Sequence, residues 1–216
     1  MTELNENLGF SEKAIQAEIE LQKTLSPEEN AERYLTLKRK SGIDPLTGLK
    51  NKEAITEEIT SIESILKRLN DKYCVLFVDV DNLKQVNDTK GHDKGNEVIV
   101  NVANSLVKTS LRKSDKVGRW TKGDEFIVFL EGMNDQTSYS YRERLLETIK
   151  ENGALSDISL SIGAATCDFS KEKEKTFLDV VNEADKAMYK SKEAKGKRIG
   201  QVGMIFYNEI SNNEQK

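Results

Sequence analysis

Cysteine is scarce in this sequence, with two residues among 216. Cys74 and Cys167 each lie inside an apolar, strand-like segment, and neither has a second Cys or His at metal-ligand spacing. Neither a disulfide framework nor a zinc site is therefore indicated. We expect two reduced cysteines in a hydrophobic core.

Long hydrophobic runs and an excess of basic residues are also missing. No apolar stretch approaches the roughly 20 residues that cross a bilayer, and no hydrophobic signal segment follows Met1. The formal net charge is -4, so the basic footprint that generic nucleic-acid binding requires is absent. We expect a cytoplasmic protein with no membrane segment and no nucleic-acid partner.

The length allows one substantial domain and an appendage. Residues 1–43 are rich in Glu, Gln, Lys and Asn, and they predict a helical segment with a sparse apolar stripe. Ser11 can cap a first helix, and Ser26, Pro27 and Glu29 form the start of a second one with a capping box. This segment either packs on the main domain or on a second copy of itself, or it is a loosely attached leader.

Residues 44–206 predict an α+β sandwich, followed by a polar C-terminal tail at 207–216. The apolar run Tyr73–Val78 is typical of a central strand that is covered on both faces. Two short strands around RWTKGDEF form a hairpin, and MIFY near residue 205 is a candidate edge strand. After residue 50 the predicted order is α-β-α-α-β-β-α-β-α-β, with helices covering a mostly antiparallel sheet.

Asp79 and Asp81 alternate with apolar residues at the end of the central strand, so both point to one side. Carboxylates there are costly unless a cation or hydrogen bonds satisfy them, and Mg²⁺ prefers such oxygen ligands. For Asp79 we favour a metal site. For Asp81 we favour the alternative, a cap on the helix that starts at Asn82.

Asp124 and Glu125 are adjacent carboxylates at the mouth of the predicted hairpin. Neighbouring residues of a regular strand face opposite sides of the sheet. Asp124 and Glu125 could therefore bind one metal ion only if they lie on the turn. The alternative is a polar turn before a hydrophobic strand. If a carboxylate of the hairpin lies beside a carboxylate of the central strand, a site for a metal ion and a nucleotide is plausible.

Five motifs follow one another in a single order: DPLTGLKNK at 44–52, FVDVDNLKQVND at 77–88, GHDKGNEVI at 91–99, RWTKGDEF at 119–126 and EADKAMYKSKEAKGKR at 183–198. Together they resemble the GGDEF family, the diguanylate cyclases that make cyclic di-GMP from two GTP. The resemblance covers about three quarters of the chain. It implies a palm-like fold related to nucleotide cyclases, Mg²⁺ or Mn²⁺ as cofactor, and a homodimer in which each copy holds one GTP.

The resemblance also assigns roles by motif position. Asp79, the Val80 carbonyl and Asp124 would hold the metal, and Asp124 with its neighbour Glu125 would act on the 3′-hydroxyl. The phosphates would be bound by backbone N–H groups and cations, namely Asn82, Leu83, Lys84, Lys192 and Arg198. Without the resemblance, we would interpret Lys192 and Arg198 as solvent-exposed basic residues at the end of a helix.

Base recognition is assigned to Asn87 and to a second residue nine positions later, where the family has Asp and this chain has Asn96. An Asp accepts two hydrogen bonds from guanine, whereas an Asn offers one carbonyl and an unmatched donor. Because of Asn96, the preference for GTP could be weaker here, or another purine could be accepted. His92 is either a substrate contact or a residue with a structural hydrogen bond.

Arg112 and Asp115 match the RxxD motif of the family's product-inhibition site, with Arg144 as an additional contact. Arg-x-x-Asp alone is also common as a surface ion pair. The chain departs from the family in the turn, where one residue is inserted and Lys122 replaces a Gly. These departures leave open a catalytically inactive domain that binds cyclic di-GMP or serves as a dimerisation module.

Overall fold

The computed structural model describes residues 20–21, 23–40, 42–110, 112–121, 123–155, 158–195 and 202–214. The chain divides into two compact units, Met1–Ser41 and Gly42–Lys216. This division lies two residues before the predicted start of the main domain at Asp44. Within the described residues, no helix combines the length and the apolar character needed to cross a membrane.

In the first unit, helix α3 (Pro27–Lys40) begins as its sequence predicts. The Glu29 backbone N–H donates to Ser26 Oγ at 3.2 Å, and the Ser26 N–H donates to Glu29 Oε2 at 2.8 Å. The capping box is thus confirmed. The earlier helix predicted from Ser11 lies outside the described residues.

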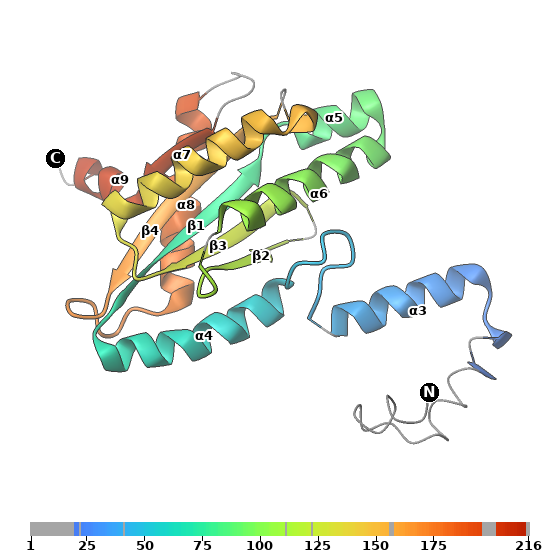
Figure 1. Ribbon diagram of the computed structural model, residues 1–216, viewed down its shortest axis with the longest axis horizontal. Helices are drawn as coiled ribbons and strands as arrows, with labels where there is room; N and C mark the ends of the chain where they lie inside the picture. Colours follow the sequence, from blue (N-terminus) through green and yellow to red (C-terminus); the bar gives the residue numbers. More distant parts are fainter. Residues whose placement is uncertain are drawn as a thin grey trace. The chain divides into compact units, whose positions relative to one another are not determined.

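The second unit has the predicted order of elements and one helix more (Figure 1). Its elements are α4 (Lys52–Leu69), β1 (Lys72–Val80), α5 (Leu83–Lys90), α6 (His92–Thr109), β2 (Lys116–Arg119), β3 (Glu125–Glu131), α7 (Asp135–Glu151), a 3₁₀ turn (Gly153–Leu155), β4 (Leu160–Asp168), α8 (Phe177–Lys195), β5 (Val202–Phe206) and α9 (Tyr207–Glu214).

Helix α9 corrects the prediction of a polar tail after residue 206. Tertiary contacts anchor it, because Tyr207 packs against the core and Asn208 bonds the carboxylate of Asp135. Tyr139 also donates to Glu209 at 2.8 Å. The segment has no apolar stripe of its own, so its periodicity could not reveal a helix.

The sheet has five strands in the order β2-β3-β1-β4-β5. All neighbouring strands are antiparallel except β4 and β5, which are parallel. The mostly antiparallel sheet of the prediction is confirmed, including the edge strand formed by MIFY. Strand β1 lies in the middle of the sheet, which explains its continuous apolar run.

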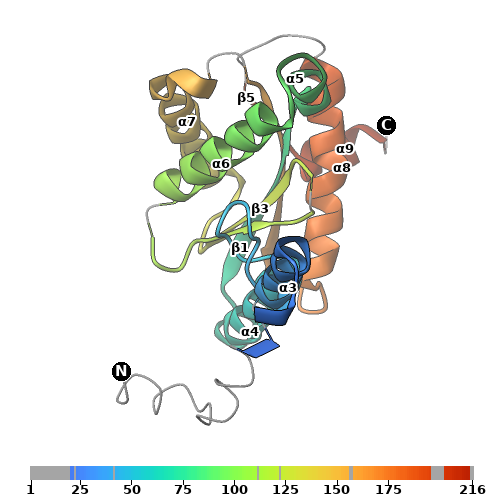
Figure 2. The ribbon, with the colours of Figure 1, turned by 90° about the vertical axis from the view of Figure 1, so that its right-hand side faces the viewer.

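Two hydrophobic clusters cover the two faces of the sheet. Side chains of β1 alternate between them, with Leu76 and Val78 in the cluster of α6 and α7, and Val75 and Phe77 in the cluster of α4 and α8. Figure 2 shows these helix pairs on opposite sides of the strands. Asp79 continues the alternation and therefore lies on the face of α8.

Candidate active site at the end of the central strand

Asp79 is the next-to-last residue of β1 and lies between two neighbouring strands. It is opposite Glu125 of β3 and Ser161 of β4. Its residue surface is only 5% exposed. Burial raises the pKa of this carboxyl, and the Lys192 ammonium, 2.7 Å from Asp79 Oδ1, opposes that effect. The site therefore holds a buried carboxylate against a cation.

Asp124 lies in the bend before β3 and is tied to the end of β1. Its backbone carbonyl accepts a hydrogen bond of 3.1 Å from the Val80 N–H. Burial and Lys192 have the largest effects on the pKa of Asp79. The negative charge of Asp124 has a smaller effect and raises this pKa. The structure thus brings Asp79, Val80 and Asp124 to one place.

Glu125 is the first residue of β3, and its carboxyl lies among other polar groups. Burial raises its pKa, a hydrogen bond from the Thr121 side chain lowers it, and the charges of Asp124, Asp79 and Asp185 raise it. The net shift is upward. Sequence reasoning missed Thr121 and Asp185 as neighbours of this carboxyl. Asp185 precedes Lys192 by seven residues on α8, a spacing of about two turns that could have revealed it.

Asp81 follows β1 and points to the same side as Asp79, as the alternation predicts. Its Oδ1 accepts a hydrogen bond of 2.7 Å from the Ser161 hydroxyl, and the residue is 7% exposed. Helix α5 begins at Leu83 after Asn82, which adopts a left-handed conformation with φ 59°. The contact with Ser161 links Asp81 to β4, a neighbour that the helix-cap prediction did not include.

Lys192 reaches the carboxylates from α8, with its side chain about half exposed. Burial lowers the pKa of its ammonium group, but the hydrogen bond to Asp79 and the charges of Asp79, Asp81 and Asp124 outweigh that and raise it. Lys192 is therefore drawn to the carboxylate cluster rather than forming a merely solvated helix end. Arg198, predicted beside it, lies outside the described residues.

The donors at this site fit a hard divalent cation. The carboxylates of Asp79 and Asp124 and the Val80 carbonyl offer oxygen atoms of the kind that Mg²⁺ prefers, and the Lys192 ammonium lies against Asp79. Among the described residues, no group of three or more His, Cys, Asp or Glu is placed to hold a metal ion. A magnesium site that uses two carboxylates needs its other ligands from phosphate oxygens and water.

Arg119 braces the turn that carries Asp124. Its Nη1 lies 3.0 Å and 3.2 Å from the two carboxylate oxygens of Asp44, and its Nη2 donates to the Gly123 carbonyl at 2.7 Å. The Trp120 N–H donates to the Glu125 carbonyl at 2.9 Å and closes the hairpin. The inserted turn thus has two anchors. Lys122 lies outside the described residues.

The predicted backbone contacts to phosphate lie at the start of α5, and the predicted base contacts lie on either side of the corner between α5 and α6. Asn82 precedes α5, and Leu83 and Lys84 are its first residues. Asn87 is half-buried, whereas His92 and Asn96 at the start of α6 are exposed. Asn82 follows directly on Asp81, so the start of α5 is next to the carboxylates in the chain, whereas the corner at Gly91 comes a whole helix later.

Of the predicted inhibitory residues, Arg112 contacts Asp115, and Arg144 lies near Tyr141 of α7. The Arg112 N–H donates to Asp115 Oδ2 at 3.2 Å, and the Arg112 guanidinium donates to the Glu131 carbonyl. The Arg144 guanidinium lies 5.8 Å from the Tyr141 ring centre. Burial raises the Tyr141 pKa, and among the nearby charges Asp115 raises it and Arg144 lowers it. Asp115 and Arg144 therefore both act on Tyr141, and Arg112 is joined to this group through Asp115.

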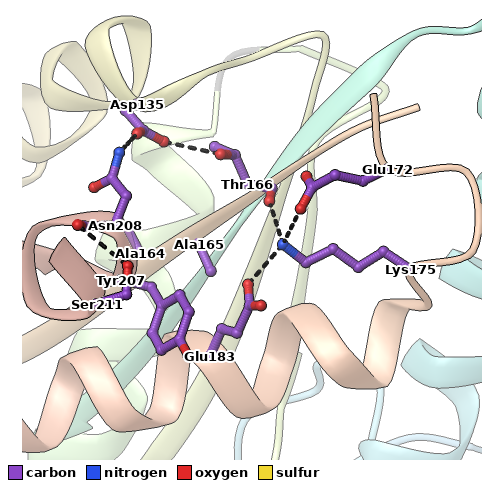
Figure 3. Close-up of a pocket in the computed structure, with 10 residues that line it drawn as sticks. All are labelled: Asp135, Ala164, Ala165, Thr166, Glu172, Lys175, Glu183, Tyr207, Asn208 and Ser211. Atoms are coloured by element: carbon purple, nitrogen blue, oxygen red, sulfur yellow. Dashed lines mark hydrogen bonds and ion pairs between the residues drawn. The ribbon is translucent and has the colours of Figure 1, made fainter. Parts of the chain in front are cut away.

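A separate cavity of about 260 Å³ lies toward the other end of β4, beside α9 (Figure 3). Lys175 donates there to the Thr166 carbonyl, Glu172 and Glu183, at 3.1, 3.0 and 2.8 Å. Asp135 accepts from Thr166 Oγ1 at 3.0 Å and from Asn208. These polar groups satisfy one another, so the cavity is a weaker candidate than the carboxylate cluster.

Comparisons with known proteins agree with the fold and the motifs. The family described as diguanylate cyclase, GGDEF domain, matches residues 41–198. The chain is 34% identical over 179 residues to diguanylate cyclase DgcP of Escherichia coli (strain K12), covering 82% of this chain and 52% of that protein. It is 32% identical over 130 residues to diguanylate cyclase A of Treponema denticola, covering 58% of this chain and 34% of that protein. The chain thus spans about half the length of these curated relatives, or less.

Solved structures show the same fold. Diguanylate cyclase SiaD of Pseudomonas aeruginosa, in complex with its activator SiaC, superposes with a TM-score of 0.64 at 27% identity, covering 94% of this chain and 78% of that chain. The GGDEF domain of DgcB from Caulobacter crescentus, in complex with c-di-GMP, gives 0.63 at 23% identity, covering 76% and 93%, and this likeness concerns the fold alone. Because the family match extends over more than half of its length, this chain belongs to the GGDEF-domain (diguanylate cyclase) family.

Proposed function

We propose that the chain is a diguanylate cyclase that condenses two GTP into cyclic di-GMP across the interface of two copies. The observation that carries this proposal is the gathering of Asp79, Asp124 and Glu125 at the end of β1, beside the ammonium of Lys192. These three carboxylates come from β1, from β3 and from the bend before β3, and the cation comes from α8. A polar turn alone does not require such a group.

Asp79, Asp124 and the Val80 carbonyl would hold the divalent cation. When bound, Mg²⁺ or Mn²⁺ neutralises phosphate charge and lowers the pKa of a coordinated hydroxyl. Asp124, with Glu125 beside it, would accept the proton of the 3′-hydroxyl. The 3′-oxygen of one GTP then attacks the α-phosphate of the other, and pyrophosphate leaves.

Other groups of the chain would bind and orient the nucleotide. Backbone N–H groups at the start of α5, from Asn82, Leu83 and Lys84, are available to phosphate oxygens as free donors of a helix terminus. Lys192 and Arg198 would add positive charge. Asn87 would bind the guanine edge, with His92 nearby as a further contact.

Asn96 motivates a second candidate, a cyclic-dinucleotide synthase that also accepts adenine. Its exposed carboxamide stands where the family has an acceptor-only carboxylate. A mismatched polar pair in a closed pocket costs on the order of 1–3 kcal/mol, which is enough to weaken guanine preference.

Arg112, Asp115 and Arg144 would form a product-inhibition site. Asp115 is 9% exposed, and its Oδ1 is buried without a hydrogen-bond partner. A guanine N–H is a donor that would satisfy this oxygen. The same cluster motivates a rival, an inactive domain that binds cyclic di-GMP there, or a dimerisation module.

Chromatography of reactions with Mg²⁺ and GTP, ATP or both distinguishes these candidates. We expect cyclic di-GMP from GTP, and its loss in Asp124→Ala but not in Glu147→Gln, a control on the exposed face of α7. No cyclic dinucleotide from concentrated protein under any condition would rule out the enzyme. Product that persists in Asp124→Ala would rule out the assigned metal ligand.

Calorimetry with cyclic di-GMP tests the inhibitory site. Tight binding that is lost in Arg112→Ala, together with turnover that cyclic di-GMP suppresses, supports product inhibition. The same binding without any turnover supports the receptor. Wild-type binding in Arg112→Ala would contradict both.

A further inference from the structure

Gly95, in the first turn of α6, lies directly against the side chain of Asn87 on α5. A Cβ atom built on Gly95 would be 1.8 Å from Asn87 Oδ1 and 2.9 Å from its Cγ. Both separations are far shorter than van der Waals contact. The Asn87 carboxamide therefore occupies the space that any side chain at position 95 would fill.

The backbone holds the two residues in this relation. Gly91 alone joins α5 to α6, with φ at 84°, a conformation that favours glycine. The Gly91 N–H donates to the Asn87 carbonyl at 2.9 Å, and the Gly95 N–H donates to the Gly91 carbonyl at 3.3 Å. The corner thus fixes the Asn87 backbone, and the missing Cβ fixes where its carboxamide can lie.

The helix itself does not require glycine at position 95. Gly95 is absent from the residues with positive φ among those the structure describes, so alanine fits its backbone. Glycine inside a helix is less favourable than alanine. A glycine can also be needed where a neighbouring group leaves no space for a Cβ atom, and here that group is the Asn87 side chain.

We propose that Gly95 is a positioning residue for the substrate base, because its missing side chain lets the Asn87 carboxamide rest against α6. This inference rests on the proposed function, in which Asn87 binds the guanine edge. Gly95 acts through Asn87 and does not itself touch the nucleotide.

The clash expected in Gly95→Ala should move the Asn87 side chain without unfolding the protein. This outcome distinguishes a positioning role of Gly95 from a role in stability. The atoms that the new methyl meets first, Oδ1 and Cγ, belong to the end of a flexible side chain. Asn87 can rotate away while the backbone stays in place. The protein should therefore fold but hold its base contact in the wrong position.

The test compares Gly95→Ala with Gly153→Ala, a control in which the new Cβ meets nothing within 4 Å. We expect the thermal midpoint of Gly95→Ala to be no lower than that of the wild type. Its KM for GTP should rise roughly tenfold while kcat changes less, as when a ground-state contact is lost. Gly153→Ala should keep both wild-type constants.

A double-variant cycle checks that the effect passes through Asn87. The Asn87→Ala/Gly95→Ala protein should have the KM of Asn87→Ala within about twofold, because the methyl then has no carboxamide to displace. Additive increases in KM would overturn the inference. So would a wild-type KM in Gly95→Ala.

GTP binding measured by calorimetry keeps this inference distinct from the proposed activity. If the wild type binds GTP without turnover, the cyclase proposal fails, and a roughly tenfold loss of affinity in Gly95→Ala still supports the role of Gly95. Equal affinities of the two proteins would overturn it. A wild-type protein that neither binds nor converts GTP overturns both.

Discussion

Two buried carboxylates of the domain, Asp44 and Asp79, are each paired with a cation, yet their pKa values shift in opposite directions. Burial tends to raise both. For Asp44, hydrogen bonds from Thr47 and Arg119 outweigh burial and lower the pKa. Asp79 has one Lys192 contact and the charges of Asp124 and Asp81 nearby, so its pKa is raised. Of these two sites, the candidate active site is the one with an excess of negative charge, which a metal ion would relieve.

Asp44→Asn should destabilise the domain by about 3 kcal/mol at neutral pH, because it removes the negative charge that faces the buried Arg119 guanidinium. Asp44 has a lowered folded pKa, so its contribution is present above its unfolded pKa and lost as pH falls through the folded value. Urea unfolding from pH 7 to pH 2 measures this. The variant should lose less stability over the acidic part of the range than the wild type. Parallel pH curves for the two proteins would contradict the argument.

Thr121→Val should lower cyclase turnover roughly 2–10-fold, because it removes the hydroxyl that bonds Glu125. The same oxygen also accepts the Gly123 N–H at 3.4 Å. Thr121→Ser keeps the hydroxyl and should retain most of the turnover. Steady-state kinetics of the three proteins provide the test. Equal loss in the Val and Ser variants would contradict the role of the hydroxyl, because Thr121→Ser retains it.

At the scale of elements, the site depends on how closely α8 lies on the sheet. Strand β4 has Gly163 under this helix, and a Cβ there would be 1.9 Å from the Ala184 carbonyl oxygen and 2.1 Å from the Met188 nitrogen. These are backbone atoms, so no rotamer change can relieve the contact. Lys192, one turn after Met188, reaches Asp79 because of this close packing.

Gly163→Ala should therefore cost about 2–3 kcal/mol of stability and also reduce turnover, since α8 must move away from β4. Urea unfolding and GTP turnover measure the two effects. Gly153→Ala, which meets no neighbour, is the matched control. A stable Gly163→Ala protein with normal turnover would show that α8 can shift without moving Lys192.

The elements themselves were largely predictable. Apolar positions at helical spacing predicted α4 and α8, and the unbroken run Tyr73–Val78 predicted a strand covered on both faces. Helix α9 was missed because its stability comes from Asn208, Tyr207 and the Tyr139–Glu209 contact rather than from its own pattern. Periodicity detects a helix only when its buried face is apolar.

At the scale of the domain, the candidate site and α9 lie toward opposite ends of β4. Ser161 pairs with Asp79, whereas Thr166, which lines the cavity beside α9, is about 16 Å further along the strand. The carboxylate cluster should therefore tolerate changes at the C-terminal helix.

Deleting residues 207–216 should lower stability by about 2–4 kcal/mol, because it removes the hydrogen bonds to Asp135 and from Tyr139 and the packing of Tyr207 against the core. The KM for GTP should stay within about twofold, because this deletion removes no group of the site. Thermal unfolding and steady-state kinetics test both expectations. A large rise in KM with an intact fold would reveal coupling between the two ends of β4.

Motifs, periodicity and caps are local patterns, so the family, most of the order of elements and the short-range chemistry follow from the amino-acid sequence alone. The same patterns predict Asp79 at a strand end and Asp124 in a turn. The partners of these residues come from the tertiary fold: Lys192 lies against Asp79, Arg119 joins Asp44 to Gly123, and Asn87 lies against Gly95. Such contacts depend on strand register and on the depth of helix packing, which no single segment encodes.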